Sequence, residues 1–302
     1  MAPVGAASAA PLSDRHTEAL GAICRACGLD PTGAVLIRNV NNAVVRLARD
    51  PVVVRLVTLP SYVPRAQLAV TAATLFAEHD VPAIRLVPGL AQPVRAEDHV
   101  ATLWQTVPRA GPAPTGADLA RMLRVVHRLP LPVGALPEWD PLCDFRNRLR
   151  DAAELDAGDL RFLDRRTDEL AAAVEELDFP LPRAVVHGDA HLGNVIPGSR
   201  GPVLCDFDSC CIGPPEWDLT PMAVSAVRFG RPWAHQADLA AGYEFDVTSW
   251  EGFEILRDIR DLKIVAGVFP GPGRGARVAA EFRRRMASLR SGRLDDRWSL
   301  TR

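Results

Sequence analysis

The spacing of apolar and polar residues predicts a mixed helix and strand region at the start of the chain. Residues 14–28 have helical spacing, with Ser13 as the N-cap. Two apolar, β-branched runs follow at 43–47 and 52–57, and the turn residues 49–51 between them predict a hairpin. This region therefore combines a leading helix with antiparallel strands.

The next segments extend the same pattern. The run 34–37 predicts a further strand, 65–79 has the spacing of a helix with one apolar face, and 83–87 predicts another strand. Strands that surround one helix, followed by a crossing near Trp104, predict a small sheet-containing lobe. Beyond residue 111 the pattern becomes helical, beginning with 118–127.

The length of 302 residues allows one or two domains with a substantial core. We expect a disordered Ala- and Pro-rich leader over residues 1–12. We further expect an N-terminal lobe over 13–105 and a C-terminal lobe over 106–302.

Two short apolar runs each end at polar residues. Residues 184–186 lead into His-Gly-Asp-Ala-His-Leu-Gly-Asn at 187–194, and 202–204 lead into Cys-Asp-Phe-Asp at 205–208. Such runs are typical of short buried strands, which hold the side chains after them on rigid supports. The sequence therefore predicts that these polar groups face a common site.

The residue types in these two motifs indicate phosphoryl transfer. Asp189, Asn194 and Asp206 offer hard oxygen donors, which suit Mg²⁺ and a hydroxyl proton and bind soft metals poorly. An Asp, an Asn five positions later and an Asp-Phe-Asp after a strand have the spacing of a kinase-type site.

Residues 187–194 followed by Asp206 resemble the aminoglycoside phosphotransferase/choline kinase superfamily, in which this segment reads His-Gly-Asp-x-His-x-x-Asn. Residues 213–219 resemble the stretch of that family that enters a helix carrying a buried Asp. The likeness covers nearly the whole chain and is specific around 184–219. It implies an α+β, bilobal protein-kinase-like fold, with a small N-terminal antiparallel β-sheet lobe and a larger, mostly helical C-terminal lobe. By this resemblance the N-terminal lobe, 13–105, binds the nucleotide, and the C-terminal lobe, 106–302, carries catalysis and substrate binding.

The resemblance also implies roles for the motif residues. Asp189 is the catalytic residue, which orients the acceptor hydroxyl and takes its proton late. Asn194 and Asp206 hold Mg²⁺. Asp208 has two interpretations, a contact with a second metal or an Asx turn toward Gly213.

Three further motif residues are expected to support the catalytic loop. A buried Asp at the start of a helix commonly binds backbone N–H groups, and for Asp218 these would belong to the catalytic loop. His187 and His191 are expected to make supporting hydrogen bonds in the same loop.

The expected nucleotide-binding residues depart from the usual kinase pattern. The only lysine is Lys263, and Arg55 occupies the strand position where kinase-like proteins carry a phosphate-binding lysine. Arg55 either binds phosphate or Asp206, or is an outward-facing arginine on an edge strand. The partner Glu on the following helix is missing, and Leu68 falls near its position.

Other nucleotide contacts are assigned to two segments. Asn41 and Asn42 lie where a phosphate-covering loop is expected, and asparagine adopts turn conformations and donates hydrogen bonds. Gln105 lies in the hinge stretch 103–107, where we expect backbone groups to bind adenine.

Composition and charge exclude several classes of protein. A net charge of −2 gives no general attraction to nucleic acid or to an anionic membrane, and no apolar stretch reaches the about 20 residues of a membrane span. The N-terminus lacks the basic region of a signal peptide, so a cytoplasmic location is expected. The six cysteines are expected to be reduced, and the chain to be a monomer or a homodimer.

Charge is spread unevenly over the helical part. Residues 131–180 hold 13 acidic residues against 6 arginines. This acidity suits a cationic acceptor, and a solvated helical face is the other interpretation.

We therefore predict a small-molecule kinase that uses ATP and Mg²⁺. Its expected acceptor is a hydroxyl of an aminoglycoside-like antibiotic, which implies antibiotic resistance, or of an amino-sugar or amino-alcohol metabolite. The alternative is a pseudokinase or nucleotide-sensing scaffold with weak or no turnover. Only 11 residues separate Asp206 from Asp218, which leaves no room for the activation loop of a protein kinase.

Overall fold

The structure is a computed structural model that describes residues 12–39, 42–271 and 275–300. By its backbone contacts the chain divides into two compact units. Unit 1 contains 1–113, 132–136 and 194–210, and unit 2 contains 114–131, 137–193 and 211–302. The lobe boundary expected between 105 and 106 stays a prediction, and the leader expected over 1–12 lies almost wholly outside the described residues.

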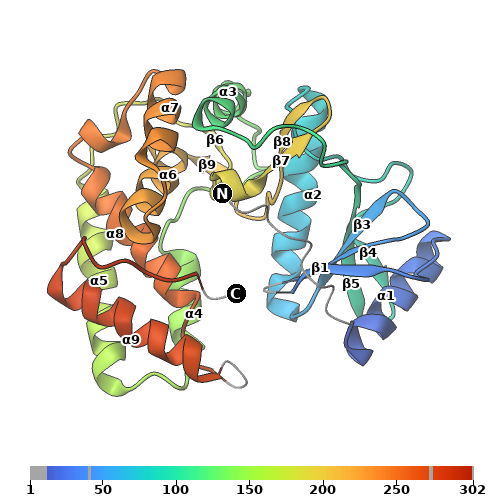
Figure 1. Ribbon diagram of the computed structural model, residues 1–302, viewed down its shortest axis with the longest axis horizontal. Coiled ribbons are helices and arrows are strands. Elements are labelled where there is room, and N and C mark those ends of the chain that lie inside the picture. Colours follow the sequence, from blue (N-terminus) through green and yellow to red (C-terminus); the bar gives the residue numbers. More distant parts are fainter. Residues whose placement is uncertain (1–11, 40–41, 272–274, 301–302) are drawn as a thin grey trace. The chain divides into compact units, whose positions relative to one another are not determined.

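Unit 1 is built on a five-stranded antiparallel sheet (Figure 1). The strands pair in the order β1-β2-β3-β5-β4. Their bounds are Val35–Asn39, Asn42–Arg46, Val52–Val57, Val94–Ala96 and His99–Gln105 for β1 to β5. The predicted hairpin is confirmed as β2 and β3, and the predicted strand at 34–37 as β1.

Strand alternation separates the two faces of this sheet. Val54 and Leu56 of β3 pack with α1, Asp14–Cys27, in one apolar cluster. Arg55 lies between them in the sequence, so its side chain points to the opposite face. The helix α1 begins as predicted, because the side chain of Ser13 accepts a hydrogen bond from the backbone N–H of His16.

The opposite face of the sheet receives α2 and the segment after β8. The helix α2, Val63–Glu78, confirms the predicted helix and follows the 3₁₀ turn Pro60–Tyr62. Its Phe76 packs edge-on against Phe207 at a centroid distance of 5.1 Å, and Trp104 of β5 does so at 5.9 Å. Phe207 is fully buried, so this aromatic contact fixes the Asp-Phe-Asp segment to the sheet.

The strand predicted over 83–87 is wrong. This run makes only isolated bridges, from Ala83 to Leu204 and from Leu86 to Trp104. Pro82 and Pro88 flank the run and supply no N–H, and its partners belong to two different strands. Beside β5, the edge of the sheet is formed by β4 instead.

The segment 194–210 forms a second, two-stranded sheet in unit 1. Strand β7, Val195–Gly198, pairs antiparallel with β8, Gly201–Leu204. The backbone of Leu204 bonds that of Pro82 and Ile84 and so ties this hairpin to the rest of the unit. Consequently Asp206 and Asp208 emerge from a strand that is anchored at its end.

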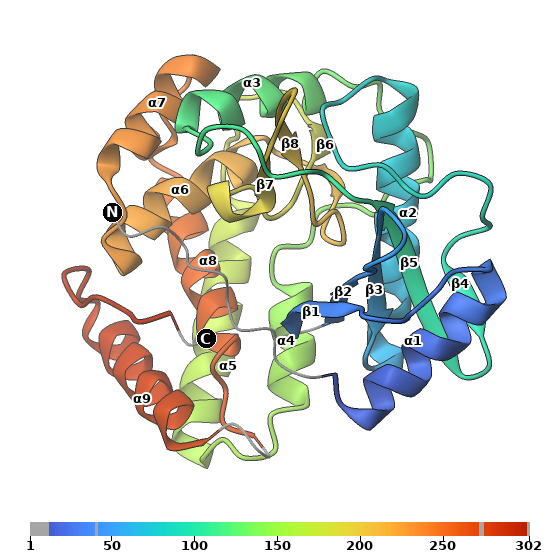
Figure 2. The same cartoon turned by 45° about the vertical axis from the view of Figure 1, so that its right-hand side comes forward.

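Unit 2 is mostly helical, with one short two-stranded sheet (Figure 2). The helix predicted over 118–127 is confirmed as α3, which Thr115 and Asp118 begin with a capping box. The sheet pairs β6, Ala184–Val186, with β9, Cys211–Gly213. The helices α3 to α9 are Gly116–Val126, Cys143–Arg150, Ala157–Glu175, Glu216–Phe229, Trp233–Tyr243, Phe253–Ala266 and Gly275–Ser291, with 3₁₀ turns at Leu192–Asn194 and Val247–Ser249.

The core of unit 2 forms around α8, which packs against α4, α5 and α6. Leu256, Ile259 and Leu262 of α8 are fully buried there, together with Trp217 of α6. Because a helix that is packed on several sides can shift little, α8 is a rigid support for the polar residues that it carries.

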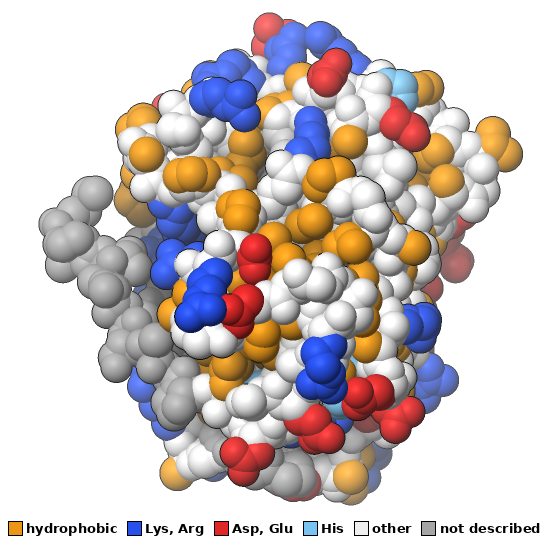
Figure 3. Space-filling view, turned by 90° about the vertical axis from the view of Figure 1, so that its right-hand side faces the viewer, with side chains coloured by type: hydrophobic (Ala, Val, Ile, Leu, Met, Phe, Trp, Pro, Cys, Tyr) orange, Lys and Arg blue, Asp and Glu red, His pale blue; other side chains and the backbone are white. Residues whose placement is uncertain are grey.

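The surface carries both signs of charge. On the face shown in Figure 3, basic and acidic side chains are interspersed with apolar ones. Among the described residues, no helix has the length and apolarity to span a bilayer, and all six cysteines are free thiols.

Candidate active site

The motif at 187–194 begins where β6 ends, in unit 2. Gly188 has a φ of +83°, a backbone conformation that residues with a Cβ rarely adopt. This bend brings the N–H groups of His187 and Gly188 to one carboxylate. The Oδ2 of Asp218 accepts from His187 at 2.6 Å and its Oδ1 accepts from Gly188 at 2.8 Å.

Asp218 is fully buried in the first turn of α6. Burial alone would raise its pKa, but the hydrogen bond from His127 and the backbone N–H bond from His187 hold the pKa below its ordinary value. The carboxylate is therefore ionised at neutral pH. In this state it can accept both backbone hydrogen bonds and so fixes the start of the catalytic loop.

His127 and Tyr243, to which no motif in the sequence assigns a role, complete the surroundings of Asp218. The Nε2 of His127 lies 3.1 Å from Asp218 Oδ2, and its Nδ1 lies 2.8 Å from the hydroxyl of Tyr243. With the proton on Nε2, the imidazole donates to the carboxylate and accepts from the tyrosine. These residues come from α3 and α7, so only the packing of those helices reveals the contact.

Asp189 follows in the same loop and faces α8. Its Oδ1 accepts a hydrogen bond of 2.8 Å from Arg260 Nη2, and its Oδ2 lies 3.6 Å from His191 Nε2. The side chain of Asp189 is 41% exposed, whereas that of Arg260 is only 7% exposed. Sequence reasoning missed Arg260, because nothing in its local pattern links it to a residue 71 positions away.

The two motif histidines make local hydrogen bonds. His187 is fully buried, and its Nδ1 accepts from the N–H of Asp189 at 3.3 Å. His191 Nδ1 accepts from the N–H of Gly193 at 2.9 Å. A Cβ at Gly193 would lie 2.7 Å from the His191 ring, so the glycine permits this close approach. Both histidines therefore shape the loop that carries Asp189.

In unit 1, Asp206 and Asp208 flank the buried Phe207. Asp206 has a φ of +71°, a left-handed conformation that is strained for a residue with a side chain. The anchored hairpin before it and the aromatic contacts of Phe207 after it hold this conformation. Asn194 precedes β7, is nearly buried, and its backbone carbonyl accepts from the N–H of Cys205 at 2.9 Å.

Arg55 bridges both of these aspartates. Its Nη1 lies 3.0 Å from Asp206 Oδ1, and its Nη2 donates to Asp208 Oδ2 at 2.6 Å. With its amide oxygen turned toward the guanidinium, Asn42 accepts from Arg55 Nε at 3.0 Å and from Nη2 at 2.9 Å. The outward-facing interpretation of Arg55 is therefore wrong, since strand alternation points its side chain toward the carboxylates.

Charge and burial act against each other in this group. Burial lowers the pKa of Arg55, but the charges of Asp206 and Asp208 more than offset it, and the net pKa is raised. Burial and the neighbouring charge of Asp206 raise the pKa of Asp208, although Arg55 and Arg65 oppose that rise. The arginine thus holds together two carboxylates that would otherwise repel each other.

Arg55 has acidic partners although α2 offers it no glutamate. Leu68 and Gln67 of α2 offer no carboxylate, and Glu78 ends the helix. Instead α2 places Arg65 where its positive charge acts on Asp208. The counter-charge for Arg55 therefore comes from the segment after β8 rather than from the helix.

The donors available for a metal ion are oxygens. Asp206 Oδ1 is buried and lies 3.0 Å from Arg55 Nη1, so a cation bound at this oxygen would have to displace the guanidinium. No group of three or more His, Cys, Asp or Glu side chains within the described ranges could hold a metal. A site of one or two carboxylates and an amide oxygen, completed by phosphate oxygens, suits Mg²⁺.

The remaining expected nucleotide contacts have mixed outcomes. Asn41 lies outside the described residues. Gln105 ends β5, and its amide donates to the carbonyl of Leu86 at 3.0 Å. In the hinge stretch, the backbone N–H and carbonyl of Leu103 already bond the side chain of Gln92. Thr106 Oγ1 is buried with no hydrogen-bond partner among the described residues.

The structure thus gathers the predicted residues into two groups. Within unit 2, one loop carries His187, Asp189 and His191, and Asp218 of α6 binds the start of that loop. Within unit 1, Arg55, Asn42, Asp206 and Asp208 form one cluster. Gly193 ends one part of the chain and Asn194 begins the other, so the motif itself runs from unit 2 into unit 1.

A known protein family matches a long stretch of the chain that includes the motif residues. The profile of the phosphotransferase enzyme family matches residues 36–256. Among curated protein sequences, no match was found.

Solved structures with the same fold are similar over almost the whole chain. Amicoumacin kinase hAmiN, in complex with AMP-PNP, Ca²⁺ and Ami, has a TM-score of 0.68 at 12% identity, covering 95% of this chain and 98% of that one. A choline/ethanolamine kinase family protein from Mesorhizobium loti gives 0.60 at 18% identity, covering 91% and 99%. The spectinomycin phosphotransferase APH(9)-Ia, with ADP and spectinomycin, gives 0.58 at 15% identity, covering 87% and 90%. These likenesses confirm the kinase-like α+β fold.

Proposed function

Because the chain belongs to the phosphotransferase enzyme family, we propose that it transfers the γ-phosphate of ATP to an alcohol hydroxyl of a small molecule, with Mg²⁺ as the metal ion. In this reaction the acceptor oxygen bonds the γ-phosphorus while the bond from that phosphorus to the leaving oxygen of ADP breaks. The proton of the hydroxyl passes to Asp189.

The observation that carries this proposal is the setting of Asp189. Its loop is fixed by the backbone hydrogen bonds to Asp218, its Oδ1 is engaged by Arg260, and the side chain is still 41% exposed. A carboxylate that is both oriented and accessible can accept a hydrogen bond from a substrate hydroxyl. A purely structural carboxylate, such as Asp218, has no accessible surface.

The residues of unit 1 are assigned to the nucleotide. Asn194 and Asp206 would hold Mg²⁺, with Asp208 beside them, and the bound metal ion neutralises charge on the transferred phosphate. Arg55 and Asn42 would face the phosphates, and Asn41 and Gln105 keep the nucleotide-binding roles expected from the sequence. The bound AMP-PNP and ADP of the similar structures support a nucleotide donor.

The acceptor is proposed as a class. Aminoglycoside-like antibiotics, amino sugars and amino alcohols are the first compounds to test, because amicoumacin kinase, spectinomycin phosphotransferase and choline/ethanolamine kinase share the fold. Since ATP is the donor, we place the reaction in the cytoplasm. Resistance to an antibiotic would follow only if that antibiotic is the acceptor.

The test is release of ADP from ATP and Mg²⁺ in the presence of each candidate acceptor. The wild-type protein should release ADP with at least one acceptor. Asp189→Asn should lower kcat about 10²- to 10⁴-fold while Mg²⁺-ATP still binds. The matched control is Asp178→Asn, an exposed carboxylate in the same unit, which should keep wild-type turnover. Turnover by Asp189→Asn at the wild-type rate would remove Asp189 from the mechanism.

One observation favours the alternative of a nucleotide-sensing scaffold. Arg55 already engages Asp206 and Asp208, so a metal ion must compete with a guanidinium for these carboxylates. A protein that binds ATP by calorimetry and releases no ADP with any of the candidate acceptors would fit this alternative and count against a kinase for these acceptors.

A further inference from the structure

An arginine of unit 2 contacts the proposed catalytic loop. Arg260 lies on α8, and its Nη2 donates to Asp189 Oδ1 at 2.8 Å while its Nη1 lies 3.4 Å from the carbonyl of Gly188. One guanidinium therefore bonds both the side chain and the backbone of the same loop. Its planar fork gives these two bonds a fixed relative direction.

The guanidinium is also held from one side by an aromatic ring. Its central carbon lies 5.0 Å from the centroid of the Trp217 ring, a cation–π distance. The indole Nε1 of Trp217 donates to the carbonyl of Gly188 at 3.1 Å. Because Trp217 is buried in the core of unit 2, it fixes both the loop and the arginine.

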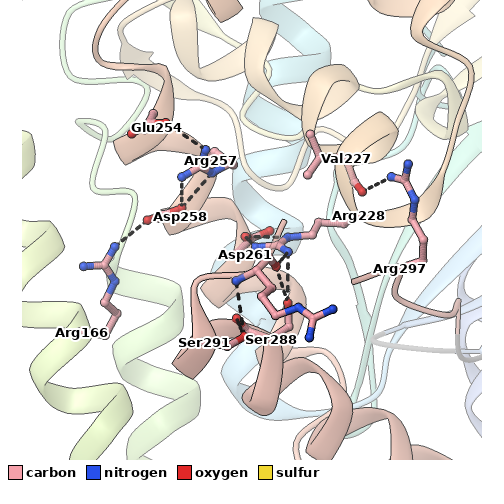
Figure 4. A network of polar contacts seen from close by, with 11 residues as sticks. Arg166, Val227, Arg228, Glu254, Arg257, Asp258, Asp261, Ser288, Ser291 and Arg297 are labelled. Carbon is pink, nitrogen blue, oxygen red and sulfur yellow. Dashed lines mark hydrogen bonds and ion pairs between the residues drawn. The ribbon is translucent and has the colours of Figure 1, made fainter. Parts of the chain in front are cut away.

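The helix that carries Arg260 is immobilised by ion pairs on its neighbouring residues (Figure 4). Asp258 pairs with Arg166 of α5 at 2.5 Å. Asp261 accepts two hydrogen bonds from the buried Arg228 of α6, at 2.9 Å and 2.5 Å. These pairs leave α8 little freedom to slide or turn, so the position of Arg260 is set before any substrate binds.

We propose that Arg260 is the positioning residue of the catalytic carboxylate, which holds Asp189 in one rotamer so that its Oδ2 edge meets the acceptor hydroxyl. This proposal rests on the proposed function, because only the proposed reaction brings a substrate hydroxyl to Asp189. The proposal goes beyond the proposed function because it assigns the orientation of Asp189 to α8, a helix that carries none of the expected motif residues.

This arrangement has a chemical consequence for the base. Burial by itself raises the pKa of Asp189, but the charge of Arg260, together with His191 and Lys263, holds the pKa well below its ordinary value. Asp189 is thus ionised throughout the physiological range, and its affinity for protons is low. Its contribution is then mainly orientation of the hydroxyl, with proton transfer late in the reaction.

A structural role of Arg260 has to be separated from this one. A buried guanidinium always needs acceptors, so its removal could act only by loosening the core. The pH profile distinguishes the two roles. Loss of the positive charge raises the pKa of Asp189, so the acid limb of kcat/KM must move to higher pH at pH values where the variant is still folded. A loosened core moves the acid limb only by unfolding the protein, which circular dichroism at the same pH values detects.

The experiment compares wild type with Arg260→Gln and Arg260→Lys over a pH series. For Arg260→Gln we expect a 10- to 100-fold loss of kcat with KM changed less than threefold, and an acid limb shifted to higher pH by about one unit. Arg260→Lys keeps the positive charge and loses the planar guanidinium. It should therefore keep the acid limb of kcat/KM at the wild-type pH, with a kcat between those of wild type and Arg260→Gln. Arg257→Gln is the matched control, an arginine of similar burial one turn away that pairs with Asp258. Arg257→Gln should leave the acid limb of kcat/KM at the wild-type pH.

A second measurement does not depend on turnover. In a double-mutant cycle of Asp189→Asn and Arg260→Gln, stability is measured by urea unfolding. The double variant should lose less stability than the sum of the losses in the two single variants. Additive losses, or an Arg260→Gln acid limb at the wild-type pH, would overturn the proposal. Coupling in a protein that releases no ADP would support the contact and remove only the proposed function.

Discussion

The two polar clusters use the same chemistry in different ways. In unit 1, Arg55 bridges Asp206 and Asp208, and all three side chains keep some exposure, at 17%, 28% and 15%. In unit 2, Asp218 has none and is bound by two backbone N–H groups and His127. The difference lies in the partner, since a guanidinium can turn away from a carboxylate and a backbone N–H cannot.

This comparison assigns opposite roles to similar residues. A carboxylate that is bound by backbone groups is part of the fold, and its loss must disturb the chain itself. The carboxylates of unit 1, which are bound by the partly exposed Arg55, can exchange that partner for a metal ion. We therefore expect the largest loss of stability when the buried carboxylate of unit 2 is removed. We expect the largest response to Mg²⁺ when the cluster of unit 1 is changed.

The largest effect is expected for Asp218→Ala. The variant leaves two backbone N–H groups and His127 without their acceptor in a buried site, so the free energy of unfolding should fall by about 3–5 kcal/mol. Urea unfolding at pH 7 measures this loss. Asp178→Ala, at an exposed position of the same unit, should change it little.

The same variant carries a pH signature. The pKa of Asp218 is lower in the folded protein than in the unfolded chain, where it is about 3.9. Its contribution is therefore fully present above that pH and is lost as the pH falls through the folded pKa. The stability difference between wild type and variant should narrow below about pH 4, and a constant difference would contradict this account.

An intermediate effect is expected for Arg55→Gln. Without the guanidinium, Asp206 and Asp208 repel each other, so unfolding in metal-free buffer should cost about 2 kcal/mol less than in wild type. Added Mg²⁺ should stabilise the variant more than it stabilises wild type, because in the variant Mg²⁺ does not compete with Arg55 for the two carboxylates. The control is Arg38→Gln, since exposed Arg38 lies 3.9 Å from Asp206, and its effect should be close to zero. An equal response to Mg²⁺ in both proteins would show that Arg55 does not limit access to the carboxylates.

The smallest effect is expected for Thr106→Val. The hydroxyl of Thr106 is buried without a hydrogen-bond partner among the described residues, so its removal should change stability by less than about 1 kcal/mol, in the stabilising direction. If the hydroxyl binds nucleotide, affinity for Mg²⁺-ATP should fall about threefold to tenfold by calorimetry. Unchanged affinity would exclude Thr106 from the nucleotide site.

The sequence by itself determined most of the elements of unit 1 and the motif. Helical and strand periodicity located α1, α2 and the β2–β3 hairpin, because these depend on residues close together in the chain. The motif residues from His187 to Asp206 pointed to the family, since their types and spacing reflect a fixed reaction. The roles assigned to them stay predictions.

Only the tertiary structure decided the long-range partners. The run 83–87 looks like a strand, yet its pairing sites lie on different strands, so it forms isolated bridges. Arg260, His127 and Tyr243 carry no local signal, and the packing of α3, α7 and α8 brings them to the catalytic loop. Local periodicity reports which side of an element is buried, whereas the partner of a buried charge depends on which elements pack together.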